Sequence, residues 1–93
     1  MEAGEERAET WTTRAADLAT EGTVMRRLLE IHPVLLTADE LVRELAGEAP
    51  GFVERDAIER AVRDLTGVGL IHHHGEFVVP TRAALHLSEL LER

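Results

Sequence analysis

Apolar residues in the first third of the chain recur at helical spacing and predict two helical segments. A narrow stripe of Trp11, Ala15 and Leu18 predicts a helix over residues 10–20. A broader apolar face predicts a second helix over 23–32, formed by Val24, Met25, Leu28, Leu29 and Ile31. Gly22 separates the two segments unless they form one bent helix, and Pro33 ends the second because it disfavours helical geometry at His32. Residues 1–9 are acidic and nearly devoid of large apolar groups, which predicts disorder.

The middle of the chain reads as two helices joined by a turn. Thr37 and Glu40 have the spacing of a capping box, which predicts a helix that starts there and ends at Gly47. A turn over 48–52 follows. A second helix over 54–66 has one apolar side, formed by Ala57, Ile58, Ala61, Val62 and Leu65.

The last third predicts a hairpin and a final helix. Leu70 and Ile71 begin one strand, residues 77–79 form its partner, and His74-Gly75 is the expected tight turn. Residues 34–36 are a short extended run that can add a third strand to this hairpin. Thr81 caps a helix over 82–91. The four leucines of this helix provide more apolar surface than a small domain needs to complete its core. Packing against the first helices and a dimer contact both explain that excess.

Composition narrows the class of protein. A chain of 93 residues without cysteine is one domain with neither disulfides nor thiolate metal sites. The acidic start does not resemble a signal peptide, and no apolar run approaches the ~20 residues of a membrane span, so we expect a cytoplasmic protein with no membrane partner. The net charge is −8, divided equally between residues 1–21 and 22–93. Such acidity opposes non-specific DNA binding, which depends on Lys and Arg neutralising phosphates.

The order of these elements resembles the winged helix-turn-helix superfamily of prokaryotic transcription regulators, and a group of short actinobacterial proteins with the same plan. The resemblance covers roughly residues 22–91 and rests on the segments 57–65, Gly69-Leu70-Ile71 and 77–84. It implies a fold that is mainly α with a small antiparallel β-hairpin. The domain organisation is then a disordered stretch at 1–9, a helical extension at 10–21 and a winged helix-turn-helix domain at 22–93.

The resemblance also implies dimeric binding to double-stranded DNA, with the helix at 54–66 in the major groove and a wing at 72–76 beside it. Carried over by position, the nucleic-acid-binding residues are Arg55, Arg60, Arg63, His72, His73 and His74. Regulators of this type often have Arg or Lys in the wing, whereas this chain has histidines and Glu76.

The arginines on the helix at 54–66 have a second interpretation as members of ion pairs on a solvated surface. Asp56 stands four residues before Arg60, and Glu59 four before Arg63, which is the favoured orientation for such pairs. Arg55, Arg60 and Arg63 are balanced by Glu54, Asp56 and Glu59. Pairs of this kind contribute about 0.2–0.5 kcal/mol, so they do not prevent phosphate binding.

The three consecutive histidines allow a metal site or a pH-sensitive wing, but a polar wing tip is the simpler interpretation. His72 and His74 would share one face of a strand, and two histidines without a third ligand make a weak metal site. We therefore predict no metal and no cofactor. Protonation below about pH 6 would add positive charge to the wing and raise DNA affinity.

Two functions remain open from the sequence. One is a DNA-binding transcription regulator, and the other is an acidic winged-helix module that binds a protein and not DNA. We do not expect an enzyme, because the chain lacks a phosphate loop and the spacing of a catalytic triad. A homodimer through the N- and C-terminal helices is expected with either function, and Trp11 would anchor its helix to the core or to a second subunit.

Overall fold

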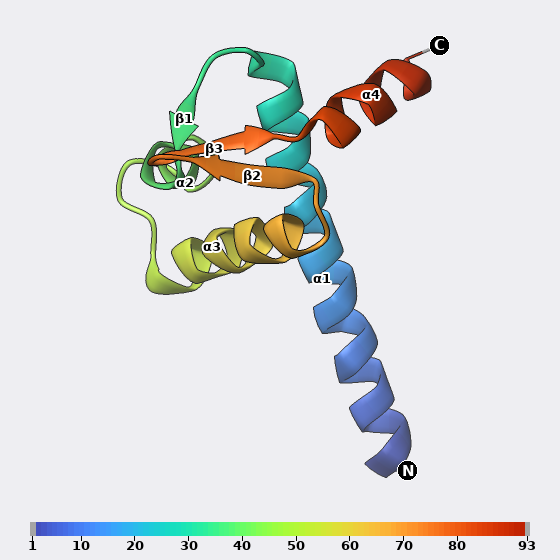
Figure 1. The fold of residues 1–93 in the computed structure, drawn as a ribbon. Coiled ribbons are helices and arrows are strands. Elements are labelled where there is room, and N and C mark those ends of the chain that lie inside the picture. Colours follow the sequence, from blue (N-terminus) through green and yellow to red (C-terminus); the bar gives the residue numbers. More distant parts are fainter. Residues whose placement is uncertain (1, 93) are drawn as a thin grey trace.

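The computed structural model describes the backbone of residues 2–92 and the side chains of residues 13–92. The chain is mainly helical, with one small antiparallel sheet (Figure 1). In chain order the elements are α1 (Glu2–Ile31), β1 (Leu36–Thr37), α2 (Ala38–Ala46), α3 (Phe52–Gly67), β2 (Ile71–His74), β3 (Phe77–Pro80) and α4 (Arg82–Leu91).

Helix α1 is continuous across the position where the sequence suggested a break. Gly22 lies within it, so the two predicted segments form one helix, and a Cβ at Gly22 would meet only the side chain of Arg26. The helix is assigned from Glu2, so it includes residues 2–9, for which we predicted disorder, and runs on through residues 10–21. The side chain of Trp11, and hence its predicted anchoring role, lies outside the described residues.

Helix α2 begins and ends as its sequence predicts. The backbone N–H of Glu40 donates to Thr37 Oγ1, and the N–H of Thr37 donates to Glu40 Oε1, both at 3.1 Å, which confirms the capping box. The helix ends at Gly47, whose φ is 93°. Within this helix, Leu41 and Val42 are buried in the core.

Helix α3 starts two residues earlier and ends one residue later than predicted. It includes Phe52, which we predicted to lie in the turn, and Val53, which was assigned to neither element, and it continues through Gly67. Beyond the cap residue Val68 the chain turns away at Gly69, where φ is 87° and the N–H of Leu70 donates to the carbonyl of Leu65 at 3.0 Å. A hydrogen bond from the N–H that follows the left-handed glycine to the carbonyl five residues earlier is characteristic of the Schellman motif.

The sheet has three strands in the order β1-β3-β2, with β3 in the middle. Leu36 pairs with Val78 and Thr37 with Phe77, so the expected third strand is present, but it covers Leu36–Thr37 and not 34–36. His74 pairs with Phe77, so the two-residue turn is Gly75-Glu76 and the predicted His74-Gly75 turn is wrong by one position. The reason is the positive φ of 61° at Gly75, which suits the first turn residue and keeps His74 in the ladder.

The core lies where α1, α2, α3 and the sheet meet. Its members are the buried residues Val24, Leu28, Leu36, Leu41, Val42, Ile58, Ala61, Val62, Leu65, Ile71 and Val78. Helix α4 begins at Thr81, whose hydroxyl accepts from the N–H of Ala84 at 3.2 Å, and it extends from the end of β3 away from α2 and α3 (Figure 1). None of the described helices combines the length and the apolarity of a membrane span.

Candidate functional site

Arg55 lies near the start of α3 and is shared between two carboxylates. Its Nη1 is 3.0 Å from Asp39 Oδ1 in α2 and 3.6 Å from Glu59 Oε1 one turn later. These contacts connect the outer surfaces of α2 and α3. Arg55 is therefore held against the protein, with its guanidinium already matched by negative charge.

Arg60 is also paired, but on the other side of α3. Its Nη1 is 3.6 Å from Asp56 Oδ2, which confirms one predicted ion pair, and its Nη2 is 3.3 Å from Asp17 Oδ1 in α1. The contact with Asp17 joins residues 43 positions apart, so sequence spacing gave no indication of it. Arg60 consequently faces α1 and not the hairpin.

Arg63 and His73 come together in an open hollow between α3 and the sheet. The hollow has a volume of about 390 Å³ and is lined by Ala38, Glu59, Val62, Arg63, Thr66 and His73. Arg63 is exposed and forms no ion pair within the described part of the chain. The predicted Glu59–Arg63 pair is absent because Glu59 contacts Arg55 instead.

The three histidines do not form one cluster. Alternation along β2 places His73 on the same face as buried Ile71, toward α3, and His72 and His74 on the opposite face. Directly across the ladder, His73 pairs with buried Val78. Among the described residues, no three His, Asp or Glu side chains are placed to hold a metal ion.

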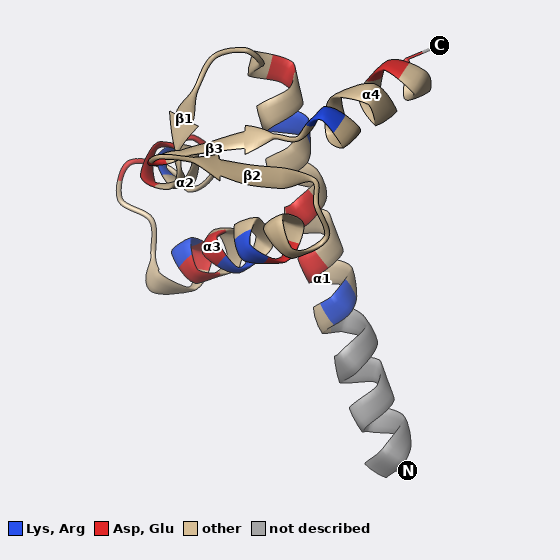
Figure 2. Cartoon of the chain, in the orientation of Figure 1, with Lys and Arg blue, Asp and Glu red and all other residues tan. Residues whose placement is uncertain are grey.

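The surface of α3 has no excess of positive charge. Between Phe52 and Gly67 the helix carries three arginines and four carboxylates, a net charge of −1. Basic and acidic residues alternate along it in Figure 2. In the hollow beside Arg63 a basic group and an imidazole lie together, and Glu59 is the acid that also lines it.

Two exposed apolar residues at the start of α3 were not among the predicted site residues. Phe52 is 83% exposed and Val53 is also largely exposed, although both lie in the first turn of a helix. On the helix they point away from the side that carries buried Ile58 and Val62. This difference in helical position is the sequence feature that marks them as exposed.

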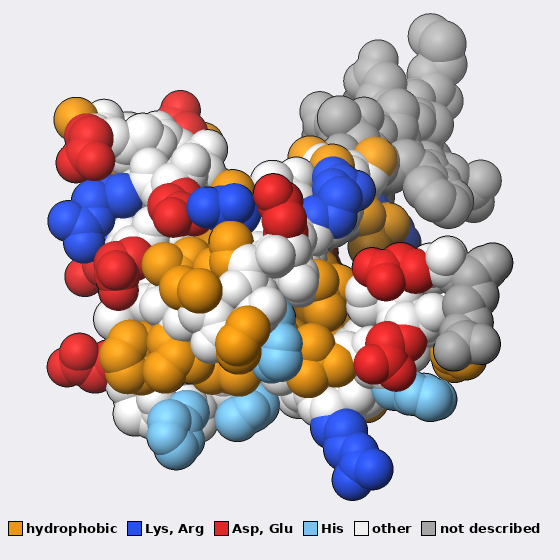
Figure 3. Space-filling view, turned by 90° about the horizontal axis from the view of Figure 1, so that it is seen from above, with side chains coloured by type: hydrophobic (Ala, Val, Ile, Leu, Met, Phe, Trp, Pro, Cys, Tyr) orange, Lys and Arg blue, Asp and Glu red, His pale blue; other side chains and the backbone are white. Residues whose placement is uncertain are grey.

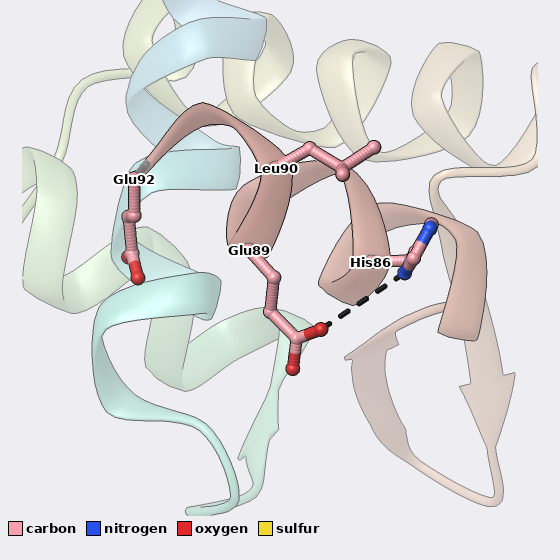
Figure 4. Close-up of a pocket in the computed structure, with 4 residues that line it drawn as sticks. All are labelled: His86, Glu89, Leu90 and Glu92. Atoms are coloured by element: carbon pink, nitrogen blue, oxygen red, sulfur yellow. Dashed lines mark ion pairs between the residues drawn. The ribbon is translucent and has the colours of Figure 1, made fainter.

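Further hydrophobic surface gathers on the face shown in Figure 3. A surface hollow of about 550 Å³ lies at the end of α4, where His86 Nδ1 is 3.9 Å from Glu89 Oε2 (Figure 4). Its four lining residues are His86, Glu89, Leu90 and Glu92, all from a single helix and its cap. Among the described residues, no second element lines this hollow, so it lacks the enclosing walls that a ligand pocket usually has.

The chain matches no protein-family model, no curated protein and no solved structure.

Proposed function

We propose that this chain is a winged helix-turn-helix protein that binds duplex DNA through α3, with the β2–β3 hairpin as its wing. The order α1-β1-α2-α3-β2-β3-α4 supports the fold. The observation that supports DNA binding most directly is that Arg63 of α3 and His73 of the hairpin line one open hollow. In this class of protein the second helix enters the major groove and the hairpin lies beside it.

Arg63 and His73 are suited to a phosphate group at this place. A guanidinium binds two phosphate oxygens in a fork, and an imidazole N–H donates a single hydrogen bond. Glu59 is the repulsive group at the same hollow, but Arg55 lies 3.6 Å from its carboxylate. Arg63 thus supplies the principal attraction, and His73 fixes the position of the phosphate.

Arg55 and Arg60 can contact DNA only if a phosphate group replaces a carboxylate as their partner. Their ion pairs with Asp39, Asp56, Glu59 and Asp17 are on the surface, where such a pair contributes about 0–1 kcal/mol. A phosphate can replace a carboxylate at that cost. The carboxylates stay close to the DNA, however, so we expect weak non-specific binding that is strongly reduced by salt.

The test is fluorescence anisotropy with a random-sequence duplex at about 50 and 200 mM salt. Loss of one phosphate contact in Arg63→Ala should weaken binding about three- to tenfold and reduce the salt slope by about one. Arg26→Ala is the matched control, because Arg26 is exposed on α1 and has no ion pair among the described side chains. Equal losses in both variants, or no binding at 50 mM salt, would contradict the proposal.

A second function, a winged-helix module that binds a protein, is favoured by Phe52 and Val53. Helix-turn-helix proteins present the first residues of the second helix to base edges. Here those residues are exposed and apolar, which suits a protein surface better than polar base edges. If DNA binding fails, a pull-down in which Phe52→Ser loses a protein that the wild type retains would support this function.

A further inference from the structure

Strand β2 presents two imidazoles side by side on one face of the hairpin. His72 and His74 are both exposed and lie on the face of β2 that points away from buried Ile71. Residues two apart on a strand are separated by about 7 Å, and their side chains leave the sheet on the same side. Staggered rotamers allow both rings to lean toward the space between them. The pair can therefore direct one nitrogen from each ring at a single small ion.

Neither imidazole is engaged by another side chain in the described part of the chain. The histidine ion pair among these residues joins His86 to Glu89, and none of the side-chain hydrogen bonds of residues 13–92 involves a histidine. Across the ladder the two rings stand opposite Val79 and Phe77, which are half-buried and carry no polar side-chain group. These cross-strand neighbours leave the ring nitrogens of β2 free to bind a ligand.

We propose that His72 and His74 chelate a divalent copper ion, with water molecules in its remaining coordination positions. Neutral imidazole is the commonest metal ligand in proteins, and copper(II) takes nitrogen and oxygen ligands in a tetragonal arrangement. Among divalent first-row metals, copper binds a given nitrogen site most tightly. The net charge of −8, which opposes DNA binding, favours the approach of a cation. Copper binding at this pair does not depend on the proposed DNA-binding function.

The choice of copper follows from the number of protein ligands. We predicted no metal from the sequence because the pair lacks a third protein ligand, which structural and catalytic zinc sites usually have. The described acids do not complete such a set, since no three His, Asp or Glu side chains among the described residues are placed together. A site with two nitrogens and otherwise water ligands therefore suits copper(II) better than zinc.

Isothermal titration calorimetry of the untagged chain with copper(II) chloride tests the chelate. His72→Ala and His74→Ala should each weaken copper binding about a hundredfold, because a second linked ligand adds a factor of about 10²–10⁴ in affinity. His73→Ala is the matched control, since His73 is an exposed histidine of the same strand on the opposite face. This control should bind copper like the wild type.

Nuclear magnetic resonance identifies the ligands directly. Copper(II) is paramagnetic, so substoichiometric copper should broaden the ring-proton signals of His72 and His74 before those of His32 and His86. The far-UV circular dichroism of the three alanine variants should equal that of the wild type, because all three histidines of β2 are exposed. Changes in copper affinity then report the loss of a ligand and not the loss of the fold.

Three results would overturn the proposal. A wild-type chain without measurable copper binding at about 1 mM metal has no such site. Equal losses of affinity in His73→Ala and His72→Ala would show that the face of β2 does not select the ligands. A double variant, His72→Ala/His74→Ala, that binds copper as tightly as the wild type would place the ion elsewhere on the chain.

Discussion

Arg60 Nη2 of α3 lies 3.3 Å from Asp17 Oδ1 of α1, and this ion pair joins residues 43 positions apart in the sequence. The contact fixes the outer side of α3 to the long first helix. It also neutralises one of the three arginines proposed to meet DNA. The availability of basic groups on α3 is therefore set by acids on α1 and α2 as well as by α3 itself.

Replacing Asp17 with asparagine should increase DNA affinity. Asp17→Asn removes one carboxylate and leaves Arg60 with Asp56 as its remaining partner at 3.6 Å. We expect binding about two- to fivefold tighter at 50 mM salt, because an exposed pair contributes up to about 1 kcal/mol. Glu30→Gln removes the same charge from α1 beside Arg27 and serves as the control. An equal gain in both variants would assign the effect to net charge alone.

The pair of Arg27 and Glu44 should make stability depend on pH in the acid range. Arg27 Nε donates to Glu44 Oε2 at 2.6 Å, and this hydrogen bond lowers the pKa of Glu44 below its usual value. The folded state therefore holds the proton less tightly than the unfolded state does. The resulting stabilisation is complete above the ordinary glutamate value of about 4.3 and disappears as the pH falls through the lower folded pKa.

Thermal unfolding of the wild type and Glu44→Gln at several pH values measures this contribution. The melting temperature of the wild type should exceed that of Glu44→Gln at pH 6. The difference should shrink as the pH falls from about 5 to 3. A difference that is the same at pH 3 and pH 6 would show that the charge of Glu44 is not responsible.

Loss of the Thr37 hydroxyl should destabilise the fold. Thr37→Ala leaves the N–H of Glu40 without its side-chain acceptor at the start of α2, at a cost of about 0.5–2 kcal/mol. Thr37→Ser keeps the hydroxyl and should lose only a few tenths of a kcal/mol. Urea unfolding at equilibrium measures both. Equal losses would mean that packing of the threonine methyl group, and not the cap, stabilises this position.

Two neighbouring glycines should respond oppositely to alanine. A Cβ at Gly67 or at Gly69 would meet no atom within 4 Å, so the two sites differ in backbone conformation and not in space. Gly69 has a φ of 87°, and Gly69→Ala should cost about 1–2 kcal/mol. Gly67 lies in α3, and Gly67→Ala should stabilise the fold by about 0.5–1 kcal/mol. Two changes of the same sign in urea unfolding would contradict this assignment of the helix end.

The local features of this protein follow from the sequence alone. The capping box at Thr37 and Glu40, the cap at Thr81 and the end of α2 at Gly47 depend on residues within one turn of each other. Such interactions leave a fixed spacing in the sequence, as does the apolar stripe of α3. The continuity of α1 through Gly22 was not determined, because a single glycine costs a helix only about 1 kcal/mol and packing decides the outcome.

The tertiary structure decided which basic groups are available and which are paired. Spacing along α3 predicted that Glu59 would pair with Arg63, but Arg55 lies nearer to Glu59, and Arg60 finds Asp17 on another helix. The strand alternation of β2 then separates His73 from its two neighbours and brings it to the hollow of Arg63. These relationships depend on how helices and strands pack, and ion pairs between distant elements leave no periodic pattern in a sequence.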